Sequence, residues 1–282
     1  MNIIFFGNSS KSLIGAKILH KALGISFIVT IPDKPGKRNQ IIVSPLKAFA
    51  QEQKIDYITV TKLDDEAIHI IDQKRPDFLV VEDYGLILPK RLLALPRFAP
   101  LNIHHSLLPK YRGPAPAPYS ILAGEKISGV SIIRMTNTVD AGDIYAQKTY
   151  TLSPDETTDS LLNKLNELGG DLVVQVIKDI VDKKAILTKQ AESKVIMTHY
   201  MKKTDGYIDL ANPPDKAKLD RMIRAYYPWP TVWTMAKIKN KEVRIKFLPQ
   251  KKLQMEGKNP VSYKDFLNGY PELTDKIEKF LH

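Results

Sequence analysis

The sequence predicts an α/β protein built around a mostly parallel β-sheet. Short apolar runs that fit buried strands recur between residues 2 and 104, and segments with helical periodicity separate several of them. This alternation is typical of right-handed β-α-β units, because parallel neighbours need a crossover connection. A chain of 282 residues, 43% of them hydrophobic, is also long enough to bury a substantial core.

The first part of the chain alternates between the two kinds of element. The predicted strands are 2–6, 25–30, 56–60, 78–82 and 99–104, and the predicted helices are 11–23, 45–53 and 64–73. Ser44 is expected to cap the second helix, with Pro45 at its first position. Prolines, a glycine and several basic residues predict a polar loop over 31–45.

The second part is organised differently. Two apolar segments, 128–135 and 143–152, follow each other without a long helix, so they are predicted to be antiparallel neighbours. A helix with leucines on one face then ends near Asp182. The remaining predicted elements are a polar and basic linker, a short helix stopped by Pro228, a hairpin over 231–248 and a helical tail over 261–282.

Composition excludes some classes of protein and leaves others open. The absence of cysteine excludes disulfides, a thiolate nucleophile and a cysteine-based metal site. No segment approaches the roughly 20 apolar residues of a membrane span, and the N-terminus does not fit a signal peptide, so we expect a cytoplasmic protein without a membrane partner. The net charge of +11 fits a nucleic-acid partner, but also a protein that is basic without a specific partner.

A candidate site lies in LNIHHSLLPKYRGPAPAP, residues 101–118. Side chains alternate along a strand, so Asn102 and His104 share one face while His105 lies on the other, where it is expected to pack or to form a hydrogen bond. Ligands bind beyond the carboxyl ends of strands in an open parallel sheet. An amide N–H can stabilise an oxyanion and an imidazole can move a proton, which suits acyl transfer. A third, orienting group is expected from TVDAGDIY, which offers Asp140 and Asp143.

No His, Asp or Glu cluster has metal-ligand spacing, so no metal is expected. GNSSKS after the first strand lacks both the Gly-rich dinucleotide fingerprint and the P-loop pattern, which argues against a dinucleotide or nucleoside triphosphate.

NIHHSLLPKYRGPAP, followed by GVSIIRMTNTVDAGDI, resembles the signature of the 10-formyltetrahydrofolate-dependent formyltransferases. IPDKPGKRNQIIVSPLKAFA, YGLILPKRLL, IRAYYPWPTVW and LQMEGKNPVSYKDFLNG resemble further stretches of that family in the same order, so the resemblance covers most of the chain. It implies a Rossmann-like catalytic domain that binds 10-formyltetrahydrofolate. It also implies a catalytic triad of Asn102, His104 and Asp140. Folate would be bound by two loops, Ser106, Leu107, Leu108 and Pro109 in one and Tyr84, Gly85, Leu86 and Ile87 in the other.

The resemblance is to the tRNA-acting members of the family and implies initiator methionyl-tRNA as the acceptor and a monomeric enzyme. Lys34, Lys37 and Arg38 in the 31–45 loop would then meet the acceptor end of the tRNA, and Lys110 and Arg112 could meet phosphate or a substrate carboxylate. The alternative for all five is ordinary solvated loop charge.

Two departures from the family pattern stand out. The LQMEGKNPVSYKDF motif follows the hairpin almost at once, which implies that most of the family's C-terminal barrel is missing. We therefore predict a catalytic domain at 1–184, a basic linker at 185–204 and a reduced C-terminal domain of hairpin plus helices at 205–282. The second departure is Glu82-Asp83, where the family more often has small or apolar residues; these carboxylates are expected to contact the pterin or to face solvent.

Two other functions remain open at this point. A sugar-nucleotide N-formyltransferase would use the same three residues on a different amine. A non-enzymatic RNA-binding relative would fit the shortened C-terminus, but the presence of Asn102, His104 and Asp140 argues against it.

Overall fold

The computed structural model describes residues 1–36, 40–238 and 241–277. The chain forms two compact units, each assembled from several stretches of sequence. The first unit consists of residues 1–116, 128–150 and 162–198, and the second of residues 117–127, 151–161 and 199–282. The domain boundaries placed after residues 184 and 204 stay a prediction.

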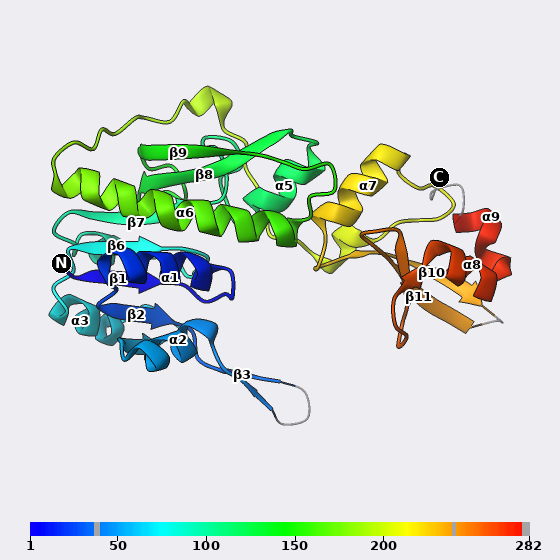
Figure 1. Cartoon of the computed structure of the whole chain (residues 1–282), viewed down its shortest axis with the longest axis horizontal. Helices are drawn as coiled ribbons and strands as arrows, with labels where there is room; N and C mark the ends of the chain where they lie inside the picture. Colours follow the sequence, from blue (N-terminus) through cyan, green and yellow to red (C-terminus); the bar gives the residue numbers. More distant parts are fainter. Residues whose placement is uncertain (37–39, 239–240, 278–282) are drawn as a thin grey trace. The chain divides into compact units, whose positions relative to one another are not determined.

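A seven-stranded sheet in the order β5-β2-β1-β6-β7-β8-β9 forms the centre of the first unit (Figure 1). Its strands are β1 (Ile3–Phe6), β2 (Phe27–Thr30), β5 (Asp56–Thr59), β6 (Phe78–Val81), β7 (Ala99–His104), β8 (Ile127–Arg134) and β9 (Ile144–Thr151). All pairs from β5 to β7 are parallel, and β8 joins β7 antiparallel. The predicted α/β class with a mostly parallel sheet is confirmed.

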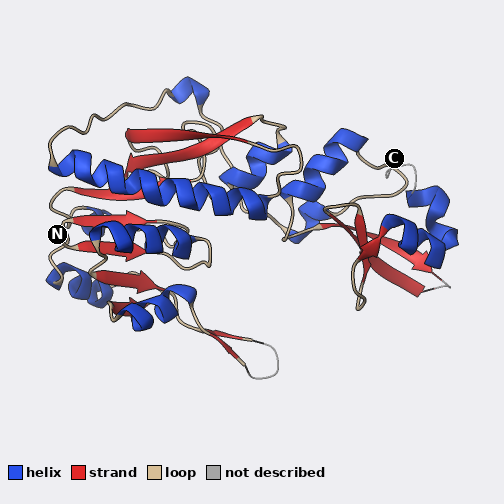
Figure 2. Ribbon diagram, viewed as in Figure 1, coloured by secondary structure: helices blue, strands red, loops and turns tan. Residues whose placement is uncertain are grey.

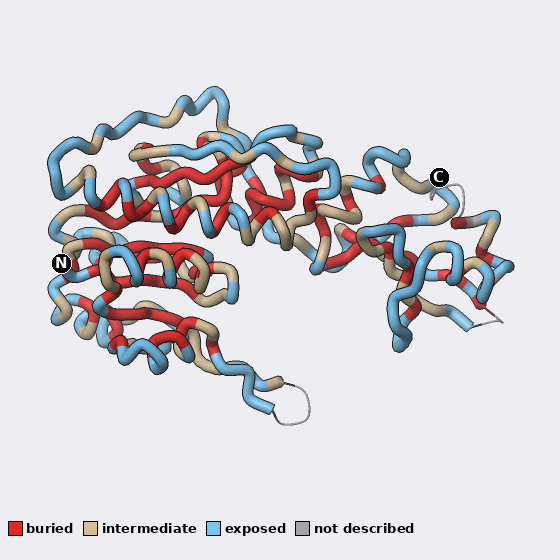
Figure 3. Tube along the Cα trace, viewed as in Figure 1, coloured by how far each residue is buried: buried red, intermediate tan, exposed pale blue. Residues whose placement is uncertain are grey.

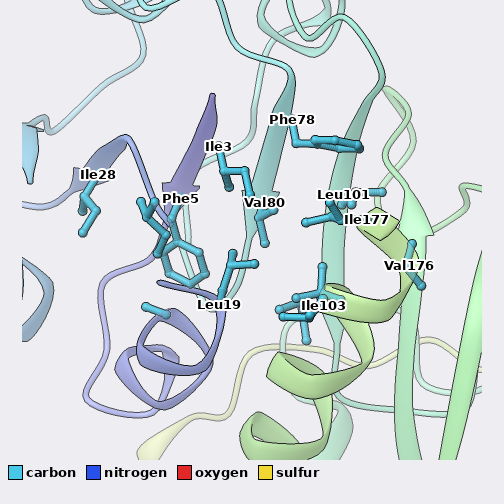
Figure 4. Packing of buried hydrophobic residues seen from close by; sticks show 14 of the residues in the cluster. Ile3, Phe5, Leu19, Ile28, Phe78, Val80, Leu101, Ile103, Val176 and Ile177 are labelled. Carbon is cyan, nitrogen blue, oxygen red and sulfur yellow. The ribbon is translucent and has the colours of Figure 1, made fainter. Parts of the chain in front are cut away.

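Helices cover both faces of this sheet (Figure 2). On one face lie α1 (Ser12–Leu23), α2 (Pro45–Gln53) and α6 (Thr158–Val181), and on the other lie α3 (Asp65–Gln73) and α4 (Lys90–Leu93). Alternate strand residues such as Phe5, Val80 and Ile103 belong to one buried cluster with Leu19 of α1 and Val176 of α6 (Figure 4). The central strands are buried along their length (Figure 3), as expected for parallel strands covered on both faces.

Some short elements were not predicted. The 31–45 segment, expected as a loop, contains a hairpin of β3 (Lys34–Pro35) and β4 (Ile41–Ile42). The helices α4 and α5 (Pro116–Leu122) were also missed, because such short helices show no periodicity in the sequence. Ser44 does precede α2, but its hydroxyl pairs with the Thr30 hydroxyl at 2.9 Å and caps no backbone N–H.

The second unit contains the predicted hairpin, formed by β10 (Val232–Ile238) and β11 (Lys241–Leu248). Two strands that the sequence did not reveal, β12 (Lys252–Met255) and β13 (Val261–Ser262), extend it to a four-stranded sheet. Each is too short to show alternation. The helices of this unit include α7 (Lys216–Ala225), α8 (Tyr263–Gly269) and α9 (Thr274–Ile277). Within the described residues, no helix has the length and apolar character to cross a bilayer.

Candidate active site

Polar side chains meet at the carboxyl end of β7, which lies between parallel β6 and antiparallel β8. Leu101 and Ile103 point into the core shared with α1 and α6. Asn102 and His104 therefore point to the opposite face, at the end of the sheet where a parallel α/β fold binds its ligands.

Asp140 joins these two residues from the loop between β8 and β9. Asn102 Nδ2 donates to Asp140 Oδ1 at 3.3 Å, and His104 Nδ1 lies 3.6 Å from the same oxygen. The side chains of His104 and Asp140 keep exposed fractions of only 6% and 12%. Charge–dipole interactions among the three are therefore screened less than at the surface. Asp143, the other candidate, contributes its backbone carbonyl, which accepts from the Arg134 N–H at 2.9 Å.

The second imidazole nitrogen of His104 fixes the tautomer. His104 Nε2 lies 2.9 Å from the backbone carbonyl of Tyr111, in a buried position. A carbonyl oxygen can only accept, so Nε2 must carry the hydrogen. In neutral His104 the unprotonated nitrogen is then Nδ1, the atom that faces Asp140. The lone pair that can accept a proton is therefore the one on Nδ1.

The Asp140 carboxylate is oriented by the backbone as well. Its second oxygen, Oδ2, accepts from the Gly113 N–H at 2.8 Å. Asp140 itself has φ +52°, in the left-handed region that few residues other than glycine and Asn or Asp adopt. Such a backbone persists only when its surroundings hold it, so the loop around Asp140 must be braced.

The predicted folate loop, Ser106–Pro109, is tied down from β8 and β9. Buried Ser131 donates to the Ser106 carbonyl at 2.6 Å and accepts from the Leu108 N–H at 3.1 Å. Gln147 Nε2 adds bonds of 2.8 Å to the Ser131 hydroxyl and 2.9 Å to the Leu108 carbonyl. This loop is therefore ordered by side-chain hydrogen bonds as well as by Pro109.

The second predicted folate loop, Tyr84–Ile87, follows β6. Tyr84 is buried with its ring edge-on to Phe6 at 5.3 Å, and burial raises the pKa of its phenol well above the usual range. Asn8 Nδ2 donates to the Tyr84 carbonyl. Gly85 has φ +85°, a backbone conformation that would be strained in a residue with a side chain. Ile87 is 79% exposed. Tyr84 thus anchors this loop in the core, and the side chain of Ile87 is exposed to solvent.

The predicted tRNA contacts do not share one environment. Lys34 in β3 and Lys110 after the folate loop are exposed, whereas Lys37 and Arg38 lie outside the described residues. Arg112 is buried, and its guanidinium pairs with Glu192 at 2.8 Å and donates from Nε to Gln190 at 2.9 Å. The guanidinium is thus already engaged within the unit, and a contact of Arg112 with phosphate or a substrate carboxylate stays a prediction.

Glu82 and His105 form a buried pair that was not foreseen. Glu82, fully buried after β6, does not contact solvent, and its Oε1 lies 3.3 Å from His105 Nε2. His105 Nδ1 lies 3.5 Å from Asp83, which is partly exposed. The expected opposite-face hydrogen bond of His105 is confirmed. Strand alternation could have indicated the pair, since Glu82 continues the face of Val80 just as His105 continues that of Ile103.

The electrostatics of this pair follow from burial. Desolvation raises the pKa of Glu82 to about 8, although contact with His105 opposes the shift. Burial alone would lower the pKa of His105, but the charge of Asp83 and the bond to Glu82 outweigh it and raise that pKa. No group of three or more His, Asp or Glu side chains suited to a metal ion occurs within the described ranges.

Comparison with known proteins assigns this site to a family. A family model described as formyl transferase matches residues 1–177. The chain belongs to the formyltransferase family. It is therefore an enzyme that transfers a formyl group from a formyl-folate donor.

Named relatives cover most of the chain. A methionyl-tRNA formyltransferase of Chloroflexus aggregans is 37% identical over 83% of this chain and 76% of its own length, and one of Agathobacter rectalis is 35% identical over the same shares. A methionyl-tRNA formyltransferase of Clostridium tetani is 30% identical over 99% of this chain and 98% of its own length. That alignment spans 311 positions, more than the 282 residues of this chain, so the relative contains residues that this chain lacks.

Solved structures share the fold at lower identity. A sugar N-formyltransferase from Shewanella has a TM-score of 0.66 at 17% identity, covering 89% of this chain and 98% of that one. A phosphoribosylglycinamide formyltransferase from Bacillus halodurans has a TM-score of 0.54 at 23% identity, over 65% of this chain and 96% of that one. These likenesses establish the formyltransferase fold and not the acceptor.

Proposed function

We propose that this enzyme transfers the formyl group of 10-formyltetrahydrofolate to the α-amine of initiator methionyl-tRNA. The observation that carries the proposal is the meeting of Asn102, His104 and Asp140 at the end of β7. An amide donor, a proton-transfer group and an orienting carboxylate on one small surface are the set that direct acyl transfer to an amine requires.

His104 is the proton-transfer group. The α-amine attacks the formyl carbon and forms a carbon–nitrogen bond while the formyl oxygen becomes an oxyanion. The attacking nitrogen then gives up a proton, and His104 Nδ1 is the nitrogen free to take it, because Nε2–H is held by the Tyr111 carbonyl. When the bond from carbon to N10 breaks, the same proton can be returned to N10, so that tetrahydrofolate leaves uncharged at that atom.

Asn102 is the oxyanion donor. Its Nδ2–H bonds to Asp140 at 3.3 Å, a long bond that an approaching anionic oxygen can replace or share. Asp140 has two functions in this scheme. Its carboxylate fixes the Asn102 amide in position, and it orients the ring of His104, whose Nδ1 lies 3.6 Å away.

The acceptor is supported by sequence and charge together. The relatives that match most of the chain are named methionyl-tRNA formyltransferases, at 30% to 37% identity. The net charge of +11 suits an RNA substrate, and Lys34 is an exposed lysine on the unit that carries the triad.

The test is formyl transfer from 10-formyltetrahydrofolate to charged initiator methionyl-tRNA, with uncharged tRNA and an amino-sugar nucleotide as parallel acceptors. We expect transfer to methionyl-tRNA alone. His104→Ala should lower kcat by about 100-fold or more, the usual contribution of general acid–base catalysis. His69→Ala, at an exposed histidine of α3, is the matched control and should be as active as the wild type. Transfer to the amino sugar instead, or an active His104→Ala variant, would refute the acceptor or the mechanism respectively.

A further inference from the structure

The segment that follows α6 lies along the first unit as a strap, residues 188–198. It was predicted to be part of a linker. Thr188 exchanges two backbone hydrogen bonds of 2.9 Å with Ile144 at the start of β9. At the other end, the Arg112 N–H donates to Ile196 at 2.9 Å and the Thr198 N–H donates to Arg112 at 2.7 Å. The strap is therefore fixed at one end to the start of β9, directly after the loop that carries Asp140, and at the other end to the loop that carries Arg112.

Gln190 is the residue of the strap that reaches the Asp140 loop. Its Nε2 donates to the backbone carbonyls of Asp140 and Gly142, both at 2.7 Å. Its Oε1 accepts from Arg112 Nε at 2.9 Å. All three bonds depend on the orientation of one amide, because the carbonyls can only accept and the guanidinium can only donate.

These bonds connect the two loops that position the triad. One loop carries Asp140, whose left-handed backbone needs support. The other carries Arg112, and its neighbours Tyr111 and Gly113 supply the carbonyl that holds His104 and the N–H that holds the Asp140 carboxylate. Gln190 therefore lies where a single side chain can hold both loops in fixed positions relative to each other.

We propose that Gln190 is a positioning residue for formyl transfer, holding the Asp140 carboxylate in reach of Asn102 and His104 through the two loop carbonyls and Arg112. Gln190 acts through other residues and has no contact with the reacting atoms. This inference rests on the proposed function, because it gives the triad its catalytic meaning.

Three variants test it. Gln190→Glu keeps the shape of the side chain but replaces the amide nitrogen that donates with a carboxyl oxygen. At neutral pH this places an anion against the carbonyls of Asp140 and Gly142. Gln190→Met removes all three bonds without adding charge. The control, Gln53→Glu, makes the same charge change at an exposed glutamine of α2. We expect kcat to fall by about 10- to 100-fold in both Gln190 variants, because displacement of a reacting group by about 1 Å can have that effect, with KM for the donor within about threefold of the wild type.

The pH profile separates positioning from general loss of structure. When the carboxyl introduced by Gln190→Glu is protonated, it regains one donor. The activity of this variant relative to the wild type should therefore rise as the pH is lowered, whereas that of Gln190→Met should not. Hydrogen exchange of peptides covering 136–143 should be faster in both variants than in the wild type.

Two failures can be told apart. If the wild type formylates methionyl-tRNA and both Gln190 variants match Gln53→Glu in kcat, the positioning role is wrong. If the wild type does not formylate methionyl-tRNA, the proposed function is wrong. In that case, hydrogen exchange of peptides covering 136–143 still tests whether Gln190 holds the Asp140 loop in place. Exchange that is unchanged in the Gln190 variants would overturn this role.

Discussion

Glu82 predicts an unusual dependence of stability on pH. Its carboxyl is fully buried beside α1 and α6, close to Gly15 and Gly169, and its Oε2 is one of the few buried side-chain oxygens in the described residues without a hydrogen-bond partner. Burial raises the pKa of Glu82 to about 8. The proposed perturbation is Glu82→Gln, which keeps the size of the side chain and removes its titration.

The sign and magnitude follow from proton linkage. Between the ordinary glutamate pKa of 4.5 and the folded value of about 8, the unfolded chain has lost a proton that the folded chain retains. The free energy of unfolding should therefore fall by about 1.4 kcal/mol per pH unit in this window, or about 3 kcal/mol between pH 5 and pH 7. The value of about 8 already includes the opposing contact with His105, so we expect a measured decline of about 2–3 kcal/mol.

Other groups do not mask the effect. The pKa of His105 is raised above its ordinary 6.5, so its contribution is complete below that value and is lost as the pH rises through the folded pKa, in the same direction as that of Glu82. Carboxyls with lowered pKa values, such as Asp33 and Asp64, stabilise the folded state by an amount that is constant above about pH 5. Their contribution is lost only as the pH falls below that value.

The assay must report on the first unit. Both tryptophans, Trp229 and Trp233, lie in the second unit, so intrinsic tryptophan fluorescence would follow the other part of the chain. Urea unfolding by circular dichroism should be combined with hydrogen exchange of peptides spanning β6 and β7, corrected for intrinsic exchange rates. Glu82→Gln should flatten the decline to below about 1 kcal/mol between pH 5 and 7, whereas the exposed control Glu52→Gln should not. Equal slopes in wild type and Glu82→Gln would refute the desolvation argument.

Three further predictions concern the two loops and the acceptor. Gly142→Ala would place a methyl group on the Arg134 carbonyl oxygen, and the resulting backbone shift should destabilise the first unit by about 2–4 kcal/mol in urea unfolding. Ser131→Ala removes both hydroxyl bonds to the folate loop, so KM for 10-formyltetrahydrofolate should rise by about tenfold while KM for tRNA stays unchanged. Lys34→Ala should raise KM for the tRNA and reduce its dependence on salt without affecting the donor, and an unchanged salt dependence would remove Lys34 from the proposed tRNA surface.

The sheet and the position of the site could be predicted because both are local in the sequence. Parallel strands buried on two faces appear as continuous apolar runs, and such runs are present in β1, β2 and β6. The spacing of Asn102 and His104 by two residues then predicts that they share a face. The choice between Asp140 and Asp143 could not be made from spacing, because the backbone of the turn decides which carboxylate points to β7.

Other features depend on residues far apart in the chain. Arg112 is separated from Glu192 by 80 residues, and its neighbour Lys110 is exposed, so nothing nearby in the sequence reveals that Arg112 is buried. The strap was missed for the same reason. Most of its residues are polar or exposed, and it is tied to the unit by Gln190, by the pairing of Glu192 with Arg112 and by the two end contacts. Polar segments are usually loops, and a pattern of hydrophobicity cannot report a hydrogen bond to a distant backbone.

The adjacent histidines show why the carboxyl end of β7 suits this chemistry. The pleat of the strand sends His104 toward Asp140 and His105 toward Glu82, so neighbouring residues of one type enter two environments. On the first face, the Tyr111 carbonyl and a carboxylate shared with Asn102 leave Nδ1 of His104 available to a substrate. On the second face, Glu82 and Asp83 lie against both nitrogens of a fully buried His105, which leaves neither nitrogen for a substrate. The partners of the two rings therefore support His104 for the proposed proton transfer, whereas those of His105 fasten β7 to the end of β6.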